Sequence, residues 1–222
     1  MEKGGAEALE TGSQAAEQTC LLVLGMHRSG TSALTRILHF AGAKLPSRLL
    51  GAGTGNEAGH WEPEALVEYH DQLLEQLGSA WHDWSQLDVK KLSSNRRDEI
   101  LSEIAKIIAE DYGDASLMVV KEPRICRFVP LFVAALHAAK ITSVPILMLR
   151  NPLEVINSLV DRNGMARTAA ALLWLRHVLD AEAATREANR ALLSFDALMV
   201  DWREEFQRIL DQTGVQLPHD AG

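Results

Sequence analysis

The sequence predicts an α/β protein of three layers, in which helices cover both faces of a mostly parallel sheet. Short apolar runs alternate with segments of helical periodicity, which is typical of this architecture. A glycine-bounded loop stands between the first apolar run and the first helical segment. The chain of 222 residues is also long enough to bury a substantial core. These three observations together favour a doubly covered parallel sheet.

Four apolar runs have the length and composition of strands that are buried on both faces. They are Cys20–Leu24, Leu117–Val120, Val144–Leu149 and Ala191–Phe195. Apolar residues at helical spacing predict helices in the segments between and after these strands. The expected helices are Thr31–Phe40, Glu62–Leu77, Asn95–Tyr112, Pro130–Ala139, Leu153–Val160, Arg167–Ala191 and Ala197–Thr213.

Element boundaries follow from capping chemistry and from turn residues. Pro63 suits the first position of a helix, Asn151 suits a helix cap, and Gly214 is a natural helix stop. The glycine-rich segment Lys44–His60 is expected to be a substrate loop or lid, with a plain surface connection as the alternative. Residues 1–19 are expected to form a flexible leader, and residues 20–222 a single domain.

Composition narrows the classes of function. A net charge of −8 disfavours a general nucleic-acid binder. We find no apolar run long enough to span a bilayer and no signal-peptide pattern, so a cytoplasmic protein is expected. Cys20 and Cys126 each lie in or beside an apolar segment, so we interpret them as reduced core thiols. No Cys/His cluster has zinc spacing, and no metal is expected.

The first functional motif is Gly25-Met-His-Arg-Ser-Gly30-Thr-Ser32, which has the glycine spacing of a phosphate-binding P-loop. Backbone N–H groups of such a loop can surround an anion, and the helix that follows adds its positive end. Thr31 stands where a nucleoside triphosphatase carries lysine. The residues expected to bind the anion are Met26, His27, Arg28, Ser29, Gly30, Thr31 and Ser32. An ordinary tight strand-to-helix turn is the alternative interpretation.

Two further motifs follow later strands. Lys121-Glu-Pro-Arg124 comes directly after the second apolar run, and Arg150 closes the third. Ser158 lies about two helical turns after Arg150, so these two residues are expected to bind a second anionic group. Since ligands of parallel α/β sheets bind beyond the carboxyl ends of the strands, all three motifs are expected to meet. A solvated charge cluster and a helix cap with a surface serine are the alternatives.

Together the three motifs resemble the P-loop sulfotransferases that use 3′-phosphoadenosine 5′-phosphosulfate (PAPS). Arg28-Ser-Gly-Thr-Ser32 is similar to the phosphosulfate loop of carbohydrate and protein-tyrosine sulfotransferases, and bacterial soluble sulfotransferases look closest. Arg150 and Ser158 resemble the pair that binds the 3′-phosphate in the family. Lys121 is similar to the lysine of the family's Lys-Asp-Pro element. The segment Ser194–Leu198 resembles a Tyr-Glu-Asp-Leu element of the family.

The sequence also departs from the family pattern. The lysine that the cytosolic branch carries in its phosphosulfate loop is absent, so Arg28 would have to serve. Glu122 replaces the usual aspartate, and Phe195 replaces a tyrosine. The glycine-rich loop with which the cytosolic branch binds adenosine is not visible. Residues that recognise adenine therefore stay unassigned.

The resemblance implies transfer of a sulfuryl group from PAPS to a hydroxyl of a small molecule or glycan, with a carbohydrate as one candidate. The acceptor must lose its proton, which calls for a general base. Glu62 is the first choice for this base and His60 the second, with Glu57 and Asp83 as further candidates. The alternative is that the negative charge of Glu62 only stabilises the positive N-terminal end of the helix that follows.

Other side chains near these motifs have less specific interpretations. Arg162 and Arg167 are interpreted as a solvated surface pair, although contacts with the donor or with an anionic acceptor stay open. Trp61, Trp81 and Trp84 are interpreted as core anchors or as a wall against which a sugar could stack. A P-loop nucleotide kinase or triphosphatase and a non-catalytic nucleotide-binding module are the competing functions. The motifs name neither the acceptor nor the oligomeric state.

Overall fold

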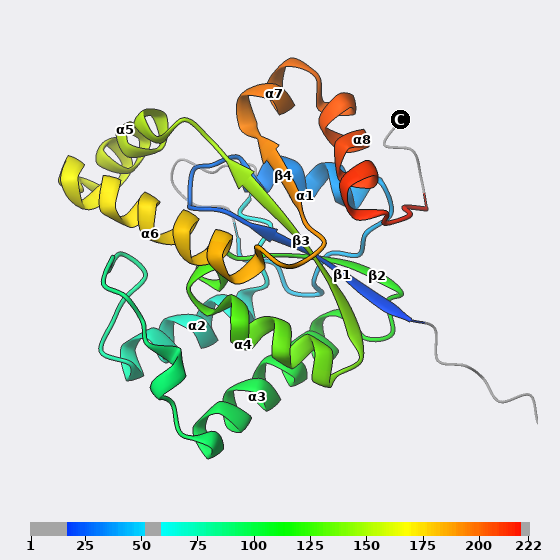
Figure 1. The fold of residues 1–222 in the computed structure, drawn as a ribbon, viewed down its shortest axis with the longest axis horizontal. Helices are drawn as coiled ribbons and strands as arrows, with labels where there is room; N and C mark the ends of the chain where they lie inside the picture. The colour runs from blue at the N-terminus through cyan, green and yellow to red at the C-terminus, as the bar shows by residue number, and fades with distance from the viewer. Residues whose placement is uncertain (1–16, 52–58, 219–222) are drawn as a thin grey trace, which may run out of the picture.

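The four expected strands form one parallel sheet in the order β2-β1-β3-β4 (Figure 1). The structure is a computed structural model and describes residues 17–51 and 59–218. The strands are β1 (Gln18–Leu24), β2 (Leu117–Lys121), β3 (Ile141–Leu149) and β4 (Ala191–Ser194). The chain connects β1 to β2 on one side and then returns to place β3 on the other side of β1. The three-layer, parallel α/β fold predicted from the sequence is therefore confirmed.

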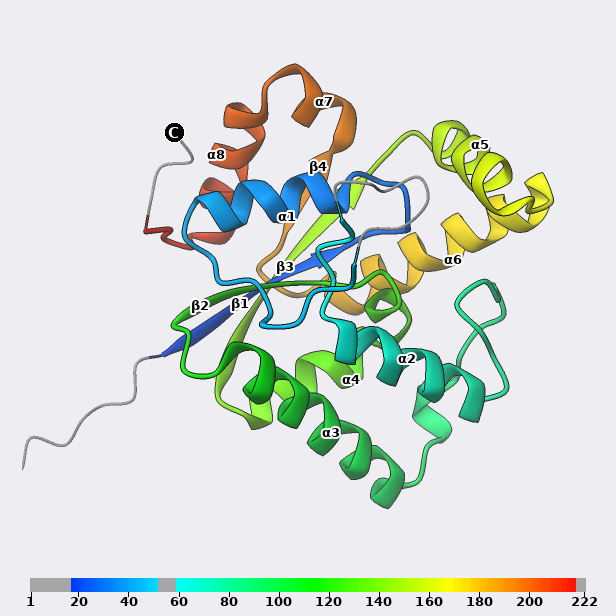
Figure 2. The same cartoon turned by 180° about the vertical axis from the view of Figure 1, so that it is seen from behind.

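Helices pack on both faces of this sheet (Figure 2). They are α1 (Thr31–Phe40), α2 (Glu64–Gln76), α3 (Ser94–Tyr112), α4 (Ile125–Ala138), α5 (Pro152–Asn163), α6 (Arg167–Thr185), α7 (Phe195–Val200) and α8 (Trp202–Thr213). A short 3₁₀ helix, Val89–Lys91, precedes α3. Among the described residues, no helix is both long enough and apolar enough to cross a membrane.

The two faces of β1 belong to two different hydrophobic cores, as expected for a central parallel strand. Leu21 and Val23 pack in the core that α1, α7 and α8 share with the sheet. Cys20, Leu22 and Leu24 point to the opposite face and pack with α2, α3 and α4. Every residue of β1 from Cys20 to Leu24 is apolar, because the side chains of a strand alternate between its faces and both faces are buried here.

Several boundaries differ from those predicted. β1 begins at Gln18, so two residues expected in the leader belong to the strand, while residues 1–16 lie outside the described part. Residues 52–58 of the expected substrate loop also lie outside it. The fourth helix begins at Ile125 and contains Pro130, which was expected at its start. Phe128 and Val129 are fully buried in this first part of α4, and their burial offsets the hydrogen bond that Pro130 cannot donate.

The end of the chain differs as well. The long helix α6 ends at Thr185 rather than at Ala191, because Ala191 pairs with Ile146 as the first residue of β4. The expected last helix is divided into α7 and α8. Asp201 separates them, because its carboxylate accepts hydrogen bonds from the backbone N–H groups of Arg203 and Glu204 and so caps a new helix.

Other predicted boundaries are confirmed. Helix α1 has the predicted limits. Asn151 caps α5 by accepting a hydrogen bond from the N–H of Leu153, and Gly214 ends α8 in the left-handed conformation. The carboxyl ends of β1, β2 and β3 meet at one edge of the sheet. This edge is where the strand order changes direction, the usual ligand site of an open α/β sheet.

Candidate functional site

The loop that joins β1 to α1 contains two glycines, Gly25 and Gly30, and each packs tightly against another part of the chain. A Cβ atom on Gly25 would lie 2.8 Å from the carbonyl oxygen of Met148 in β3. Gly30 has a φ of +85°, and a Cβ atom there would overlap with the ring of Phe195. Both positions therefore require glycine, one for the close approach of β3 and the other for the packing of Phe195.

The loop presents unpaired backbone donors at the start of α1. Gly30 is the N-cap residue and provides no side-chain cap. In the part of the chain that the structure describes, the N–H groups of Gly30, Thr31 and Ser32 donate no hydrogen bond. Arg28 also adopts a positive φ of 70°, which is an unusual conformation for a residue other than glycine. Unpaired donors at a helix N-terminus form a site that favours an anion.

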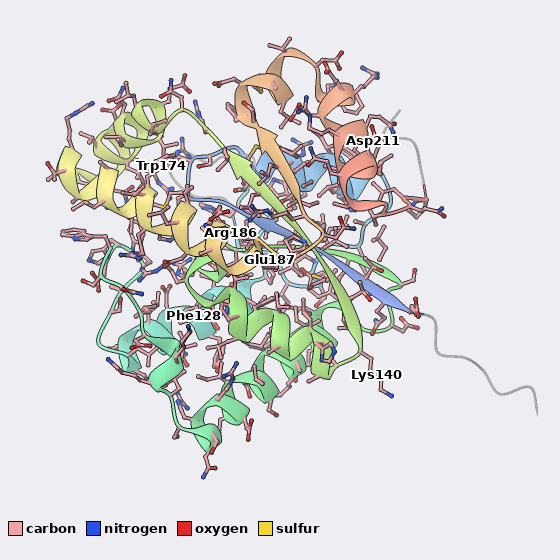
Figure 3. The ribbon with its side chains drawn as sticks, viewed as in Figure 1. Phe128, Lys140, Trp174, Arg186, Glu187 and Asp211 are labelled. Carbon is pink, nitrogen blue, oxygen red and sulfur yellow. The ribbon has the colours of Figure 1, made fainter. Side chains whose placement is uncertain are left out.

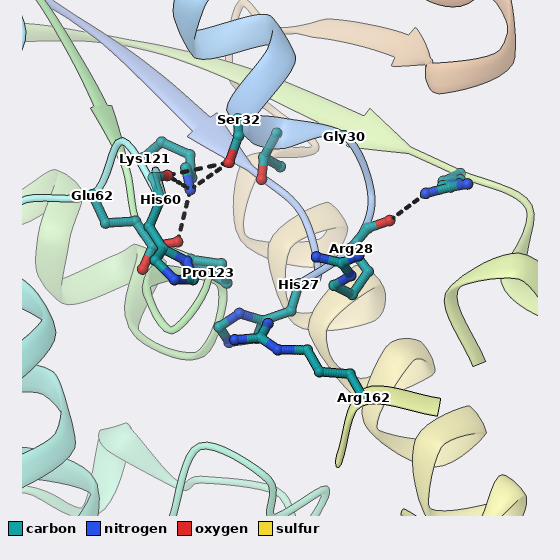
Figure 4. Close-up of a pocket in the computed structure, with 11 residues that line it drawn as sticks. His27, Arg28, Gly30, Ser32, His60, Glu62, Lys121, Pro123 and Arg162 are labelled. Carbon is teal, nitrogen blue, oxygen red and sulfur yellow. Dashed lines mark hydrogen bonds and ion pairs between the residues drawn. The ribbon is translucent and has the colours of Figure 1, made fainter. Parts of the chain in front are cut away.

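These donors face a cavity of about 190 Å³ (Figure 4). Most of the residues that the sequence pointed to line this cavity together. The predicted residues that line it are His27, Arg28, Gly30, Thr31, Ser32, His60, Glu62, Lys121 and Arg150. Pro123 and Arg162 complete the lining. The structure thus brings together residues from three strand ends and from the segment before α2.

Lys121 lies at the centre of the site and is almost completely buried. Its ammonium group donates to Glu62 Oε1 at 2.7 Å, to Ser32 Oγ at 3.2 Å and to the carbonyl oxygen of His60. Burial lowers the pKa of Lys121 and raises the pKa of Glu62, since both charged forms lose their contact with water, although each charge favours the other. All three protons of the ammonium group are therefore engaged by groups of the protein.

The two histidines of the site differ in their surroundings. Burial lowers the pKa of His60, and the positive charges of Lys121 and Arg162 lower it further. A neutral His60 ring can accept a proton. His27 meets Trp81 edge-on, with 5.4 Å between ring centroids, and its buried Nε2 has no partner among the described residues. Burial lowers the pKa of His27 well below its usual value.

Two predicted residues of the loop are directed into the protein. Met26 is fully buried in a small core with residues of α5 and α6, and Ser29 is also buried. Neither residue lines the cavity. Any contribution of Met26 to anion binding would have to come from its backbone.

Arg28, Arg150 and Ser158 form a connected group beside the loop. Arg28 Nε donates to Ser158 Oγ at 2.8 Å, and Arg150 Nη1 donates to the carbonyl oxygen of Arg28 at 2.9 Å. The Arg150 guanidinium lies 4.5 Å from the centroid of the Phe195 ring and also pairs with Glu154. An open hollow of about 570 Å³ lies against Arg28, Arg150 and Ser158. The two anion sites expected from the sequence are thus neighbours, and Arg28, Arg150 and Arg162 line both the cavity and the hollow.

The remaining residues of the second motif hold the end of β2 in place. Glu122 accepts hydrogen bonds from His70 at 2.7 Å and from Arg124 Nη1 at 2.7 Å. Burial by itself would raise the pKa of Glu122, but the His70 bond and the Arg124 charge outweigh it, and the pKa falls to about 2. Arg124 also forms two hydrogen bonds with Asp71. This buried network fixes the segment that presents Lys121.

The further candidates for the base, Asp83 and Glu57, and the arginine pair Arg162 and Arg167 remain to be placed. Asp83 lies outside this cavity, and its carboxylate accepts hydrogen bonds from Ser79 and from the N–H of Ser85. Glu57 lies outside the described residues. Arg167 donates to Asn157, whereas Arg162 lines the cavity.

The sequence left open whether Arg162 reaches the site, and it did not predict that Phe195 packs against Gly30. Arg162 follows Ser158 by one helical turn, a spacing that could have placed both on one face of α5. Phe195 and Gly30 are far apart in the sequence, and no local pattern signals their contact. The described residues contain no group of three or more His, Cys, Asp or Glu side chains that could hold a metal ion.

Comparisons with known proteins bear on the family and on the fold. A model of the sulfotransferase family matches residues 21–219. A search of curated proteins found no match. Among solved structures, a sulfotransferase domain from the Synechococcus PCC 7002 olefin synthase superposes with a TM-score of 0.57 at 17% identity, covering 94% of this chain and 78% of that chain.

Two further sulfotransferase structures share the fold. A sulfotransferase domain from the curacin biosynthetic pathway gives a TM-score of 0.51 at 15% identity and covers 92% of this chain and 76% of its own. A sulfotransferase from Mycobacterium avium gives a TM-score of 0.53 at 14% identity, and the match covers 92% of this chain and 66% of that chain. These likenesses concern the fold, whereas the family model matches nearly the whole sequence. The chain belongs to the sulfotransferase family.

Proposed function

We propose that this protein transfers a sulfuryl group from PAPS to a hydroxyl group of an acceptor and releases adenosine 3′,5′-bisphosphate. The observation that carries this proposal is the convergence of unpaired N–H groups with Lys121, Arg28 and Arg150 around one cavity. This arrangement offers many donors and positive charges to an elongated anion. Thr31 stands where a P-loop triphosphatase would carry lysine, which disfavours a nucleotide kinase.

The residues fit a donor that carries two anionic groups. We assign the N–H groups of Gly30, Thr31 and Ser32 and the Arg28 side chain to the 5′-phosphosulfate. Arg150 and Ser158 would bind the 3′-phosphate in the neighbouring hollow. The Arg28 side chain donates a hydrogen bond to Ser158, and the Arg28 carbonyl oxygen accepts one from Arg150. These two bonds would hold the two anion sites at a fixed spacing.

Transfer would depend on positioning and on charge stabilisation rather than on covalent chemistry by the protein. Negative charge develops on the leaving oxygen, by analogy with phosphoryl transfer. Lys121 is the cation placed to stabilise this charge, which requires its ammonium group to turn away from one of its present partners. Glu62 would then be released from its ion pair and could accept the proton of the acceptor hydroxyl. A carbohydrate hydroxyl is one candidate acceptor.

Calorimetry with adenosine 3′,5′-bisphosphate tests the donor site. The intact protein is expected to bind the bisphosphate without added metal. Arg150→Ala should weaken binding about 10- to 100-fold, because a charge-assisted contact with the 3′-phosphate is lost. Arg97→Ala removes an exposed arginine from α3, away from the cavity, and serves as the matched control.

Two results would count against the donor assignment. The first is a lack of binding by the intact protein, and the second is undiminished binding by a folded Arg150→Ala variant. Binding of ATP that depends on Mg²⁺ would instead favour a kinase or triphosphatase. Binding of the bisphosphate without transfer to any acceptor would favour a non-catalytic module.

A further inference from the structure

We propose that a second cavity beside the first is the acceptor site, and that it selects hydroxyl compounds that also carry a carboxylate or phosphate group. This inference rests on the proposed function. The second cavity has a volume of about 250 Å³. It shares His27, His60, Glu62 and Arg162 with the first cavity. A molecule bound there therefore lies next to both candidate bases and next to the proposed donor site.

Three of the residues that line the second cavity are apolar. They are Leu50, Trp81 and Leu159, and they come from three separate parts of the chain. Trp81 is only half-buried and is held edge-on against His27, so part of its ring remains accessible. A flat or aliphatic body would pack against these side chains while its hydroxyl pointed toward Glu62 and His60.

The charges that line the second cavity are unbalanced. Its two arginines are Arg124 and Arg162. The Arg124 charge is neutralised within the protein by Glu122 and by the two hydrogen bonds to Asp71. Glu62 supplies the negative charge of the lining, but it is paired with Lys121. Among the described residues of the lining, Arg162 is therefore the charge that has no counter-charge.

Arg162 is available to a ligand. Across residues 17–51 and 59–218 its guanidinium makes no hydrogen bond and no ion pair. Its charge acts on the site, because it is one of the charges that lower the pKa of His60. Figure 4 shows its side chain extending from α5 toward the side of the cavity where His27 lies. A guanidinium in this position matches the geometry of a carboxylate or a phosphate on the acceptor.

Three related probes test this assignment on the full chain saturated with adenosine 3′,5′-bisphosphate. Hydroxyphenylpropanoate carries a carboxylate, tyrosol phosphate carries a phosphate, and hydroxyphenylpropanamide is a neutral relative. We expect at least one anionic probe to bind the unmodified protein about tenfold or more tightly than the amide. The stronger of the two identifies the anion that is preferred. Arg162→Gln should remove the preference, and Arg97→Gln should keep it.

The outcomes separate the possible roles of Arg162. Equal affinity of all three probes, no binding of any of them, or a preference that survives in Arg162→Gln would overturn the proposal. Weaker bisphosphate binding by Arg162→Gln would also overturn it, because Arg162 would then serve the donor. If the unmodified protein does not bind the bisphosphate, the proposed function fails on its own. The same probes titrated without the bisphosphate then still decide whether the second cavity prefers anions.

Discussion

At the scale of single residues, the pair of Lys121 and Glu62 is the decisive feature of the site. Their charged groups are 2.7 Å apart and both side chains are buried. Breaking such a pair leaves an uncompensated charge unless a ligand takes the place of one partner. An anionic donor would supply this replacement for Glu62 and so couple donor binding to release of the base.

Replacing the proposed base gives a direct test of this role. Glu62→Gln keeps the size of the side chain but removes its basicity, so turnover should fall by at least about 100-fold. Affinity for adenosine 3′,5′-bisphosphate should stay the same or increase, because Lys121 is then freed from its counter-charge. Steady-state rates and calorimetry on the same preparation measure the two effects.

His60 supplies the comparison for this experiment. If turnover survives in Glu62→Gln but is lost in His60→Gln, the base is His60. If both variants retain turnover, neither residue is the base. The carbonyl oxygen of His60, which accepts from Lys121, remains in every such variant, so the comparison concerns the imidazole alone.

At the scale of elements, the connection from β1 to α1 depends on the contact between Gly30 and Phe195. Phe195 begins α7, so the last strand and the helix that follows it support the loop. The same ring carries the Arg150 guanidinium on its face, a cation–π contact. One aromatic side chain thus connects the anion loop to the third motif.

Gly30→Ala tests this support. The new methyl group overlaps with the Phe195 ring, and alanine is strained at the positive φ of this position. We therefore expect the free energy of unfolding to fall by about 1–3 kcal/mol and bisphosphate binding to weaken. Gly78→Ala is the matched control, because Gly78 has a similar φ of +70° but no atom within 4 Å of its Cβ position. Denaturant unfolding and calorimetry measure the two effects.

A double variant separates the packing effect from the backbone effect. Adding Phe195→Ala to Gly30→Ala removes the overlap and should restore part of the lost bisphosphate affinity. Equal stability of Gly30→Ala and Gly78→Ala would show that Phe195 does not constrain the loop.

At the scale of the whole molecule, buried histidines connect folding to pH. His177 is fully buried in α6, and burial lowers its pKa from 6.5 to about 4. Its Nδ1 lies 2.9 Å from the carbonyl oxygen of Leu173, and its Nε2 has no partner in the described part of the chain. The folded protein therefore holds this ring in its neutral form. The ring centroid of His27 lies 6.4 Å from that of His177, and burial lowers the pKa of His27 as well.

Stability should consequently fall as the pH decreases. Between pH 6.5 and 4 the unfolded chain binds a proton at His177 that the folded protein excludes. The stabilising contribution is complete above pH 6.5 and declines by up to about 3 kcal/mol toward pH 4. His177→Leu should reduce this slope, measured as the free energy of unfolding at several pH values. An unchanged slope would contradict the assignment.

Much of the fold follows from local patterns in the sequence. Strands β1, β2 and β3 and helix α1 could be predicted because burial on both faces demands continuous apolar runs, and because amphipathic periodicity marks a helix. Strand β4 exposes every second residue, so only one of its faces is buried. The division of the last helix could not be predicted from periodicity, since the cap at Asp201 competes with an otherwise continuous pattern. Pro130 misled the prediction for α4 because buried packing outweighs the cost of one missing hydrogen bond.

Local patterns in the sequence are enough to specify the parallel α/β fold and to place most of the site residues at the ends of its strands. Glycine spacing and strand ends are local properties, and parallel strands bring their carboxyl ends to one edge. Three contacts became visible only in three dimensions: Lys121 pairs with Glu62, Phe195 covers Gly30, and Arg162 lies beside a second cavity without a partner among the described residues. These contacts join segments far apart in the chain, and their strength depends on burial, which no local pattern encodes.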